Sequence, residues 1–178
     1  MTLDEKHIEK AQNADFDALV RIMNQANQYA IDKAGEPMWT AMEFVYRQLH
    51  AHIESSDCFV MRDEDKIVAT MTITDKDILW GEAGADGKAL YIHKLMKDPA
   101  MPAQNVGLTF LLFAAHQALK QDKKYIRCDT VPSQKHLVNY YLKLGFIKKG
   151  AFAYPTTERD GIFLEVDAEE LLKRIAQL

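Results

Sequence analysis

Apolar residues recur with the period of an α-helix near the start of the chain. In the stretch Asp15–Ala30, Leu19, Met23 and Ala26 follow Phe16 by three, seven and ten positions. This is the spacing of residues on one face of a helix. Gly35 and Pro37 interrupt the pattern, because both residues disfavour a continuing helix. The pattern predicts an amphipathic helix that ends before Gly35.

A second helical period runs from Thr40 to about Glu54. Thr40 and Glu43 fit a capping box, in which two side chains bind free amides at the start of a helix. The apolar residues expected to face inward are Phe44, Val45, Leu49 and Ile53.

Strand patterns dominate the middle of the chain. Cys58–Met61 and Ile67–Ile73 are rich in apolar and β-branched residues, and Asp63-Glu64-Asp65 supplies a turn, so a hairpin is expected. Further short strands are predicted at His7–Gln12, Ile78–Trp80, Leu90–Met96, Tyr125–Cys128, Phe146–Lys148 and Ile162–Val166.

Three more helices complete the prediction. Gly107–Gln121 is a long apolar helix, and Ser133–Leu144 is a helix that stops at Gly145, a natural C-terminal cap. Asp167-Ala168-Glu169-Glu170 repeats the capping-box pattern and opens a last helix. Ile78–Trp80 is counted as an optional extension of the hairpin, so the order of elements is β α α β β β α β α β β α.

This order predicts an α/β fold of the mixed α+β kind. Antiparallel strands come first, and the later strand–helix–strand unit implies a right-handed parallel crossover. We expect a central mixed sheet of about six to seven strands with helices on both faces. A length of 178 residues favours a single domain, residues 1–178.

Composition narrows the function classes. The net charge is -4, so the basic surface that nucleic acid requires is not expected. No apolar run approaches the roughly 20 residues of a membrane span. The first ten residues are polar and acidic rather than signal-like, which predicts a cytoplasmic protein. Cys58 and Cys128 lie in apolar strand patterns and are expected to be buried free thiols.

The segment Gln104–Thr109 carries the first chemical signal. It lies between the predicted strand Leu90–Met96 and a helix that starts near Gly107. Free amides and the helix dipole make such a start an anion site, and a glycine lets a pyrophosphate approach closely. The alternative is that Gly107 only relieves a packing contact.

Three motifs together resemble the GNAT superfamily of acyl-CoA-dependent N-acetyltransferases. Tyr91–Met96 is similar to its central cofactor-binding strand, Gln104–Thr109 to its Gln/Arg-x-x-Gly-x-Gly/Ala pyrophosphate loop, and Tyr141–Phe146 to its Tyr-x-Lys-x-Gly-Phe motif. The resemblance also covers the order of elements and implies a GNAT-like sheet and acetyl-CoA as co-substrate.

The resemblance implies specific cofactor contacts. The pantetheine arm would enter between the strands Leu90–Met96 and Tyr125–Cys128 and meet main-chain groups of Leu95, Met96 and Lys97. The pyrophosphate would lie on Gln104, Asn105, Val106, Gly107, Leu108 and Thr109. The loop departs from the family pattern, because it has no basic residue and Thr109 replaces a second glycine.

Acetyl transfer to an amine also needs proton transfers. The resemblance implies that Tyr141 is the general acid toward the leaving sulfur; the alternative is a packed ring with a wet hydroxyl. His93 has a side chain suited to a general base, and strand alternation places it with Tyr91 and Leu95 on one face. A histidine at such a place is more often a hydrogen-bonded structural residue; Asp129 is a second candidate base, and water could carry the proton instead.

The acceptor is expected to be a primary amine of a small molecule. Trp39 follows the Gly35–Pro37 break and could contact it through a cation–π interaction, or could be a core residue. No metal, nucleic-acid or membrane partner is expected, and a homodimer is possible from the resemblance. The competing function is a non-catalytic acyl-CoA-binding sensor or interaction module of the same fold.

Overall fold

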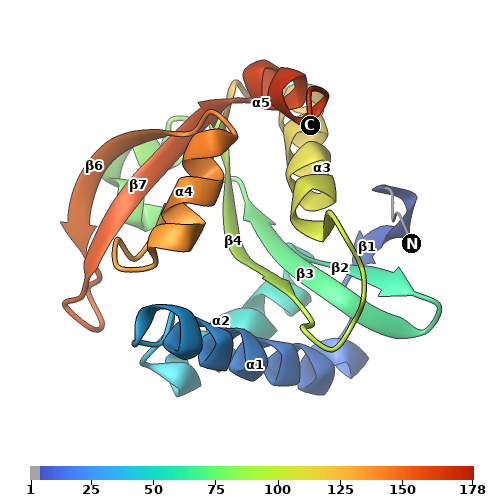
Figure 1. Ribbon diagram of the computed structural model, residues 1–178. Helices are drawn as coiled ribbons and strands as arrows, with labels where there is room; N and C mark the ends of the chain where they lie inside the picture. The colour runs from blue at the N-terminus through green and yellow to red at the C-terminus, as the bar shows by residue number, and fades with distance from the viewer. Residues whose placement is uncertain (1–4) are drawn as a thin grey trace. The chain divides into compact units, whose positions relative to one another are not determined.

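The computed structural model describes residues 5–178, which form two compact units (Figure 1). The first unit runs up to Ile73 and also contains Lys94–Phe110. The second unit contains Thr74–His93 and Leu111–Leu178. Strand β4 (Ala89–Lys97) and helix α3 (Val106–Lys120) each pass from one unit into the other. The two units are therefore described separately.

The first unit contains an antiparallel set of strands and two helices. Strand β1 (Ile8–Lys10) pairs with β2 (Cys58–Asp63), which forms the predicted hairpin with β3 (Lys66–Thr74). Short 3-10 segments, Glu5–His7 and Asn13–Asp15, flank β1. The buried residues that form its core include Leu19, Ile22, Met23, Leu49, Val60 and Val68.

Helix α1 (Phe16–Ala34) confirms the first helical period but is longer than predicted. It ends where Gly35 adopts a left-handed conformation, with φ of 79°. Such a conformation suits glycine, because it has no Cβ to clash with the backbone.

Two predictions for helix α2 (Met42–Glu54) were wrong. Ala41, not Thr40, is the N-cap, and no side chain caps the helix, because alanine has no side-chain oxygen to accept from the first amides. Phe44 is 39% exposed. Val45, Leu49 and Ile53 are buried as predicted at four-residue spacing, and Phe44 lies about 100° away from that stripe.

The second unit contains the mixed part of the fold. The first part of β4 pairs in parallel with β5 (Tyr125–Thr130), which confirms the predicted crossover. Strand β5 pairs antiparallel with β7 (Asp160–Asp167), and β7 pairs antiparallel with β6 (Ile147–Ala153). The mixed α/β fold and the predicted order of strands and helices are confirmed.

Helices α4 (Lys135–Lys143) and α5 (Ala168–Ile175) complete the second unit. The predicted cap of α5 is confirmed, since the Asp167 side chain accepts hydrogen bonds from the amides of Glu169 and Glu170. Helix α4 is shorter than predicted at its start, but Gly145 follows its end with φ of 90°, as expected of a C-terminal cap.

The segment Ile78–Ala85 is a 3-10 helical segment, η3, rather than the predicted strand at Ile78–Trp80. Asp77 precedes it, and its side chain accepts a hydrogen bond from the amide of Leu79. The chain turns back so tightly that the amide of Asp77 donates to the carbonyl of Gly84 at 2.9 Å. This local closure outweighs the strand preference of the apolar run.

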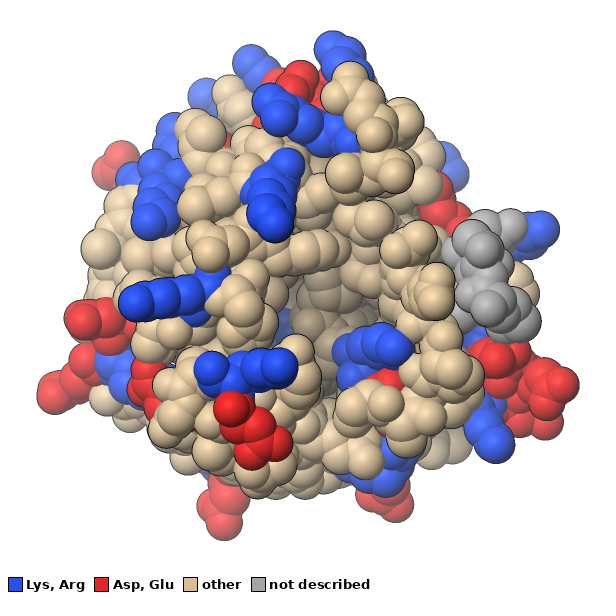
Figure 2. Space-filling model, in the orientation of Figure 1, with Lys and Arg blue, Asp and Glu red and all other residues tan. Residues whose placement is uncertain are grey.

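The cysteines, the surface charges and the membrane-spanning potential of the helices can be compared with the predictions from composition. Cys58 and Cys128 are buried and free, as predicted. On the face shown in Figure 2, acidic side chains gather at the turn between β2 and β3, whereas basic side chains are frequent over α5 and β6. Among the helices of residues 5–178, none has the length and apolar character needed to cross a membrane.

Candidate active site

Strands β4 and β5 stop pairing part of the way along their length. Their recorded pairs within the described chain are Ala89–Tyr125, Leu90–Ile126 and Tyr91–Arg127, although both strands continue beyond. Lys94 then has φ of 50°, which breaks the extended geometry of β4. The predicted alternation along β4 therefore holds only as far as His93, and does not place Leu95 with it.

Three ionisable side chains meet just past the last strand pair. One donor atom of each of Asp77, His93 and Asp129 lies within 4.8 Å of the others. His93 Nε2 is 4.0 Å from Asp77 Oδ2 and 3.2 Å from Thr74 Oγ1. The Asp77 side chain is 7% exposed and the His93 side chain 21%, so the group is shielded but reachable. His93 is thus within hydrogen-bond distance of Thr74, and the two nearby carboxylates favour a positive charge at this place.

Segment η3 holds Asp77 in this group. Its Oδ1 accepts from the Leu79 amide at 2.9 Å, while Oδ2 is the atom nearer to His93. A Cβ at Gly84 would lie 1.8 Å from the Asp77 carbonyl oxygen, so only glycine allows this approach. The carbonyl of Ala83 accepts from Tyr91 Oη at 2.5 Å, which fastens η3 to β4.

A second contact holds Asp129. Tyr154, which follows β6, donates a hydrogen bond of 2.5 Å to Asp129 Oδ2. Burial, together with the Asp129 charge and this hydrogen bond, raises the pKa of Tyr154 well above its usual range. Tyr154 therefore stays a phenol and a donor at neutral pH.

Aromatic rings border this polar group. Trp80 packs against Phe163 at 4.5 Å between centroids, and Phe163 stacks on Phe152 at 4.2 Å. Phe152 in turn meets Tyr154 at 4.7 Å. This row of rings reaches the polar group through Tyr154, which donates its hydrogen bond to Asp129.

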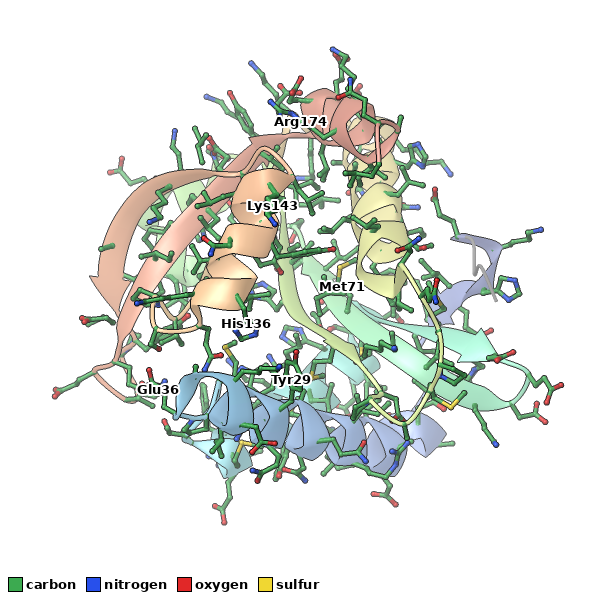
Figure 3. The ribbon with its side chains drawn as sticks, viewed as in Figure 1. Tyr29, Glu36, Met71, His136, Lys143 and Arg174 are labelled. Atoms are coloured by element: carbon green, nitrogen blue, oxygen red, sulfur yellow. The ribbon has the colours of Figure 1, made fainter. Side chains whose placement is uncertain are left out.

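Tyr141 lies on α4 with its side chain buried. Its ring packs edge-on against Phe146 at 5.0 Å and Tyr140 at 5.6 Å. Burial raises the pKa of Tyr141 well above its usual range, and the nearby Cys128 and Asp129 raise it further. In Figure 3, His136 and Lys143 mark the first and last turns of α4, with Tyr141 in the half toward Lys143.

The predicted pyrophosphate loop lies in the first unit and ends in the start of α3. Asn105 has φ of 58°, and α3 begins at the next residue, Val106. The Thr109 amide donates to the Asn105 carbonyl at 3.0 Å. The amides of Val106, Gly107 and Leu108 precede this bond and point out of the helix end, where an anion is favoured.

An ion pair fixes the start of the connection from β4 to α3, which contains this loop. Arg21 of α1 donates to Asp98 at 2.8 Å, and the Ala100 amide donates to the same carboxylate at 2.9 Å. Burial alone would raise the pKa of Asp98, but these hydrogen bonds lower it overall. The loop thus starts from a carboxylate that is charged in the folded protein.

The predicted residues are distributed over both units. His93 and Asp129 are brought together in the second unit, and Tyr141 lies close enough to Asp129 to feel its charge. Leu95, Met96, Lys97 and the loop Gln104–Thr109 belong to the first unit. Thr109 Oγ1 donates to the Asn105 carbonyl at 3.2 Å, so this hydroxyl supports the helix start.

Trp39 is a partly buried residue of the first unit. It packs against the core cluster, and its backbone exchanges two hydrogen bonds of 2.9 Å with the Asn27 side chain. These contacts fit the alternative reading of Trp39 as a core residue, and its acceptor role stays a prediction.

Sequence reasoning missed Thr74, Asp77 and Tyr154. Thr74 ends β3 and Asp77 follows it closely, so polar residues after a strand end were the available signal. Tyr154 carried no comparable signal, since only the pairing of β6 with β7 brings it to Asp129.

Comparisons with known proteins agree with the fold. Residues 17–146 match the model of the acetyltransferase (GNAT) family. A search of curated proteins found no match. Among solved structures, a GNAT-family acetyltransferase from Listeria monocytogenes is 17% identical, with a TM-score of 0.69 over 90% of this chain and 93% of that one.

Two further solved structures share the fold. An aminoglycoside N(6′)-acetyltransferase from Legionella pneumophila is 14% identical, with a TM-score of 0.68 over 94% of each chain. A protein from Salmonella typhimurium, solved with its cofactor acetyl-CoA, is 13% identical, with a TM-score of 0.59 over 90% of this chain and 92% of that one.

Proposed function

This chain belongs to the acetyltransferase (GNAT) family, and from that premise we propose that it transfers an acetyl group from acetyl-CoA to a primary amine of a small molecule by direct attack. The observation that carries the proposal is the meeting of Asp77, His93 and Asp129 where β4 and β5 stop pairing. This arrangement supports the proposal, because the three side chains lie where the backbone groups of β4 and β5 no longer pair with each other.

Deprotonation of the acceptor is the first chemical need. An alkyl ammonium has a pKa of about 10.4, so neutralising it at pH 7 costs roughly 4–5 kcal/mol. We assign His93 as the base that takes this proton, directly or through one water. Asp77 stabilises the resulting imidazolium, and Asp129 attracts the incoming ammonium. Asp129 as base remains the competing assignment.

The second need is a proton for the leaving thiolate of CoA. Tyr141 is the proposed donor, because its raised pKa keeps it protonated at neutral pH. It lies beside Cys128, whose side chain alternates with that of Asp129 along β5. Tyr141 is therefore proposed to act from the Cys128 side of β5, and His93 from the side of Asp129.

Cofactor binding is proposed at Leu95, Met96, Lys97 and the loop Gln104–Thr109. Main-chain groups of the first three would bind the pantetheine arm. The amides at the start of α3 would bind the pyrophosphate, with the helix dipole in place of the absent basic side chains. No metal is assigned to the reaction, and Trp39 is kept as a candidate acceptor contact.

The test is turnover. The protein is incubated with acetyl-CoA and a panel of amines that includes a diamine, an aminoglycoside and an amino acid, and free thiol is followed. Amine-dependent thiol release supports the proposal. Saturable acetyl-CoA binding without release across the panel would instead support the sensor function. Light scattering on the same preparation tests for a homodimer. Fractionation of cells separately tests for a cytoplasmic location.

A further inference from the structure

The second unit contains a cavity of about 630 Å³ that the proposed reaction does not use. Its lining comes from η3, the segment Asp86–Lys88, β5, β6 and β7. Its volume lies within the roughly 300–1,000 Å³ of small-molecule sites. A lone inorganic anion would occupy only a small part of it, so its size suits a larger molecule.

Basic groups outnumber acidic groups in this cavity. Lys88, Lys124, Arg127 and Lys149 contribute four positive charges, and Asp86 and Glu165 contribute two negative charges, which leaves a surplus of two. The whole chain has a net charge of -4, so the cavity is opposite in sign to the protein. Such a local surplus attracts an anion.

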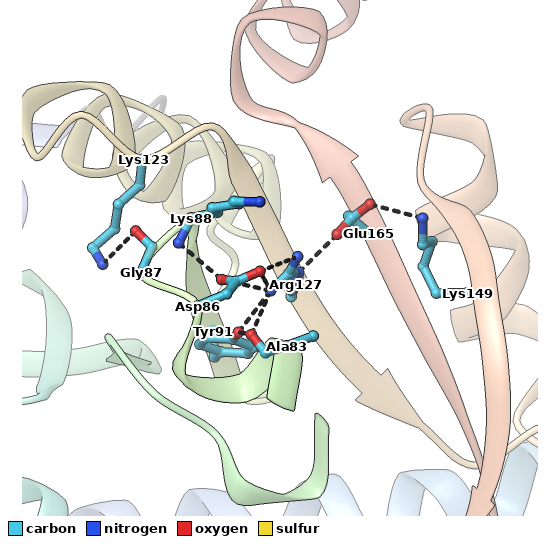
Figure 4. Close-up of polar contacts among 9 residues, drawn as sticks. All are labelled: Ala83, Asp86, Gly87, Lys88, Tyr91, Lys123, Arg127, Lys149 and Glu165. Atoms are coloured by element: carbon cyan, nitrogen blue, oxygen red, sulfur yellow. Dashed lines mark hydrogen bonds and ion pairs between the residues drawn. The ribbon is translucent and has the colours of Figure 1, made fainter. Parts of the chain in front are cut away.

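The acidic groups are already engaged by a buried arginine. Arg127 Nε donates to Glu165 at 2.7 Å, and its Nη atoms donate to Asp86 at 3.2 Å (Figure 4). Arg127 Nη1 also donates to Tyr91 Oη at 2.8 Å. Arg127 is 5% exposed and fixed by these contacts, so it forms the floor of the cavity.

Lysines surround that floor. Lys149 Nζ is 3.2 Å from Glu165 Oε1, and Figure 4 shows Lys88 and Lys149 on either side of the Arg127–Glu165 pair. Lys124 lies over the ring of Tyr125, with 5.2 Å from Nζ to the ring centroid. Arg127 and Lys149 balance the charges of Asp86 and Glu165, so Lys88 and Lys124 carry the surplus of two at the rim.

The walls of the cavity are aromatic. Trp80, Tyr125 and Phe163 line it, and the Arg127 guanidinium lies 5.1 Å from the Trp80 ring. Planar apolar walls between cations suit a ligand that joins a ring to an anionic group. We propose that this cavity is a second ligand site, which binds a small organic anion made of a planar ring and a phosphate or carboxylate group.

Trp80 provides a direct readout. The chain has two tryptophans, so Trp39→Phe leaves Trp80 as the single indole. In this background we titrate phenyl phosphate, inorganic phosphate and benzyl alcohol, which carry ring and charge together, charge alone and ring alone. We expect saturable quenching by phenyl phosphate, with weaker binding of the other two probes. Benzoate in place of phenyl phosphate separates carboxylate from phosphate recognition.

Matched variants locate the site. Lys88→Ala/Lys124→Ala should weaken phenyl phosphate binding by about tenfold, because two charge-assisted contacts are lost. Lys66→Ala/Lys173→Ala, which removes two exposed lysines outside the cavity, should leave it unchanged. Thermal melts confirm that both variants fold.

Three results would overturn the inference: no saturable quenching up to about 10 mM, equal affinity in Lys88→Ala/Lys124→Ala, or competitive displacement by acetyl-CoA. The last result would assign the anion to the cofactor site. Binding is measured without an acceptor and without turnover, so its failure is distinct from a failure of the proposed acetyl transfer.

Discussion

Tyr154 donates a hydrogen bond of 2.5 Å to Asp129, and so links the end of β6 to the carboxylate that follows the β4–β5 pairing. The bond holds Asp129 Oδ2, and one carboxylate oxygen of Asp129 lies within 4.8 Å of donor atoms of His93 and Asp77. In the proposed reaction, Tyr154 is a positioning residue, since it acts through Asp129 rather than on the acceptor.

Tyr154→Phe should lower kcat by about tenfold, the order of one lost charge-assisted hydrogen bond. The raised pKa of Tyr154 keeps it protonated, so the loss should be similar from about pH 6 to pH 9. The measurement is thiol release against pH, with the KM for acetyl-CoA expected to stay constant. A pH profile and kcat equal to those of the parent protein would remove Tyr154 from the site.

His93→Gln should lower kcat by about a hundredfold at pH 7, which is typical of a lost general base. The deficit should shrink toward about pH 10, because more of the acceptor amine is then already neutral. The control is His50→Gln on α2, a histidine whose side chain is 46% exposed. A deficit that is constant with pH would favour a structural role for His93.

Tyr141→Phe should reduce kcat by about 10- to 100-fold with little change in Tm. The ring contacts with Phe146 and Tyr140 survive the substitution, and only the hydroxyl is lost. The neighbouring Tyr140→Phe is the matched control, since burial raises the pKa of Tyr140 to about 12 but the proposed reaction does not use it. Full activity of Tyr141→Phe would exclude it as the general acid.

The fold could be predicted from the sequence because the strongest patterns in the sequence report local structure. Helix caps such as Asp167, the hairpin of β2 and β3, and the parallel β4–β5 pair all follow from short-range preferences and connection rules. The wrong strand at Ile78–Trp80 has a local cause that the apolar pattern does not show. Asp77 and Gly84 close a tight turn there that an apolar run does not reveal.

The same limit applies to the candidate site. His93 and Asp129 were predicted from their places on two adjacent strands. Asp77 depends on the local closure of η3, which the apolar pattern does not reveal, and Tyr154 depends on the pairing of β6 with β7, which brings it to Asp129. The positive φ of Lys94 could not be predicted either, because lysine rarely adopts a left-handed conformation.

Asp98→Asn should destabilise the protein by about 1–3 kcal/mol at neutral pH, because it removes the charge that Arg21 and the Ala100 amide bind. The pKa of Asp98 is lower in the folded protein than its ordinary value of 3.8. Its stabilising contribution is therefore complete above that value and is lost as the pH falls through the lower folded pKa. The difference between parent and variant should thus be largest near pH 7 and shrink below about pH 4.

Urea unfolding at about pH 7 and about pH 3 measures this prediction for Asp98. Asp65→Asn, at the exposed turn between β2 and β3, is the control and should change the free energy of unfolding little at either pH. Because Asp98 fixes the start of the loop that leads to α3, the variant should also raise the KM for acetyl-CoA while kcat stays close to the parent value. A stability difference that is the same at both pH values would show that Asp98 acts through packing rather than through its charge.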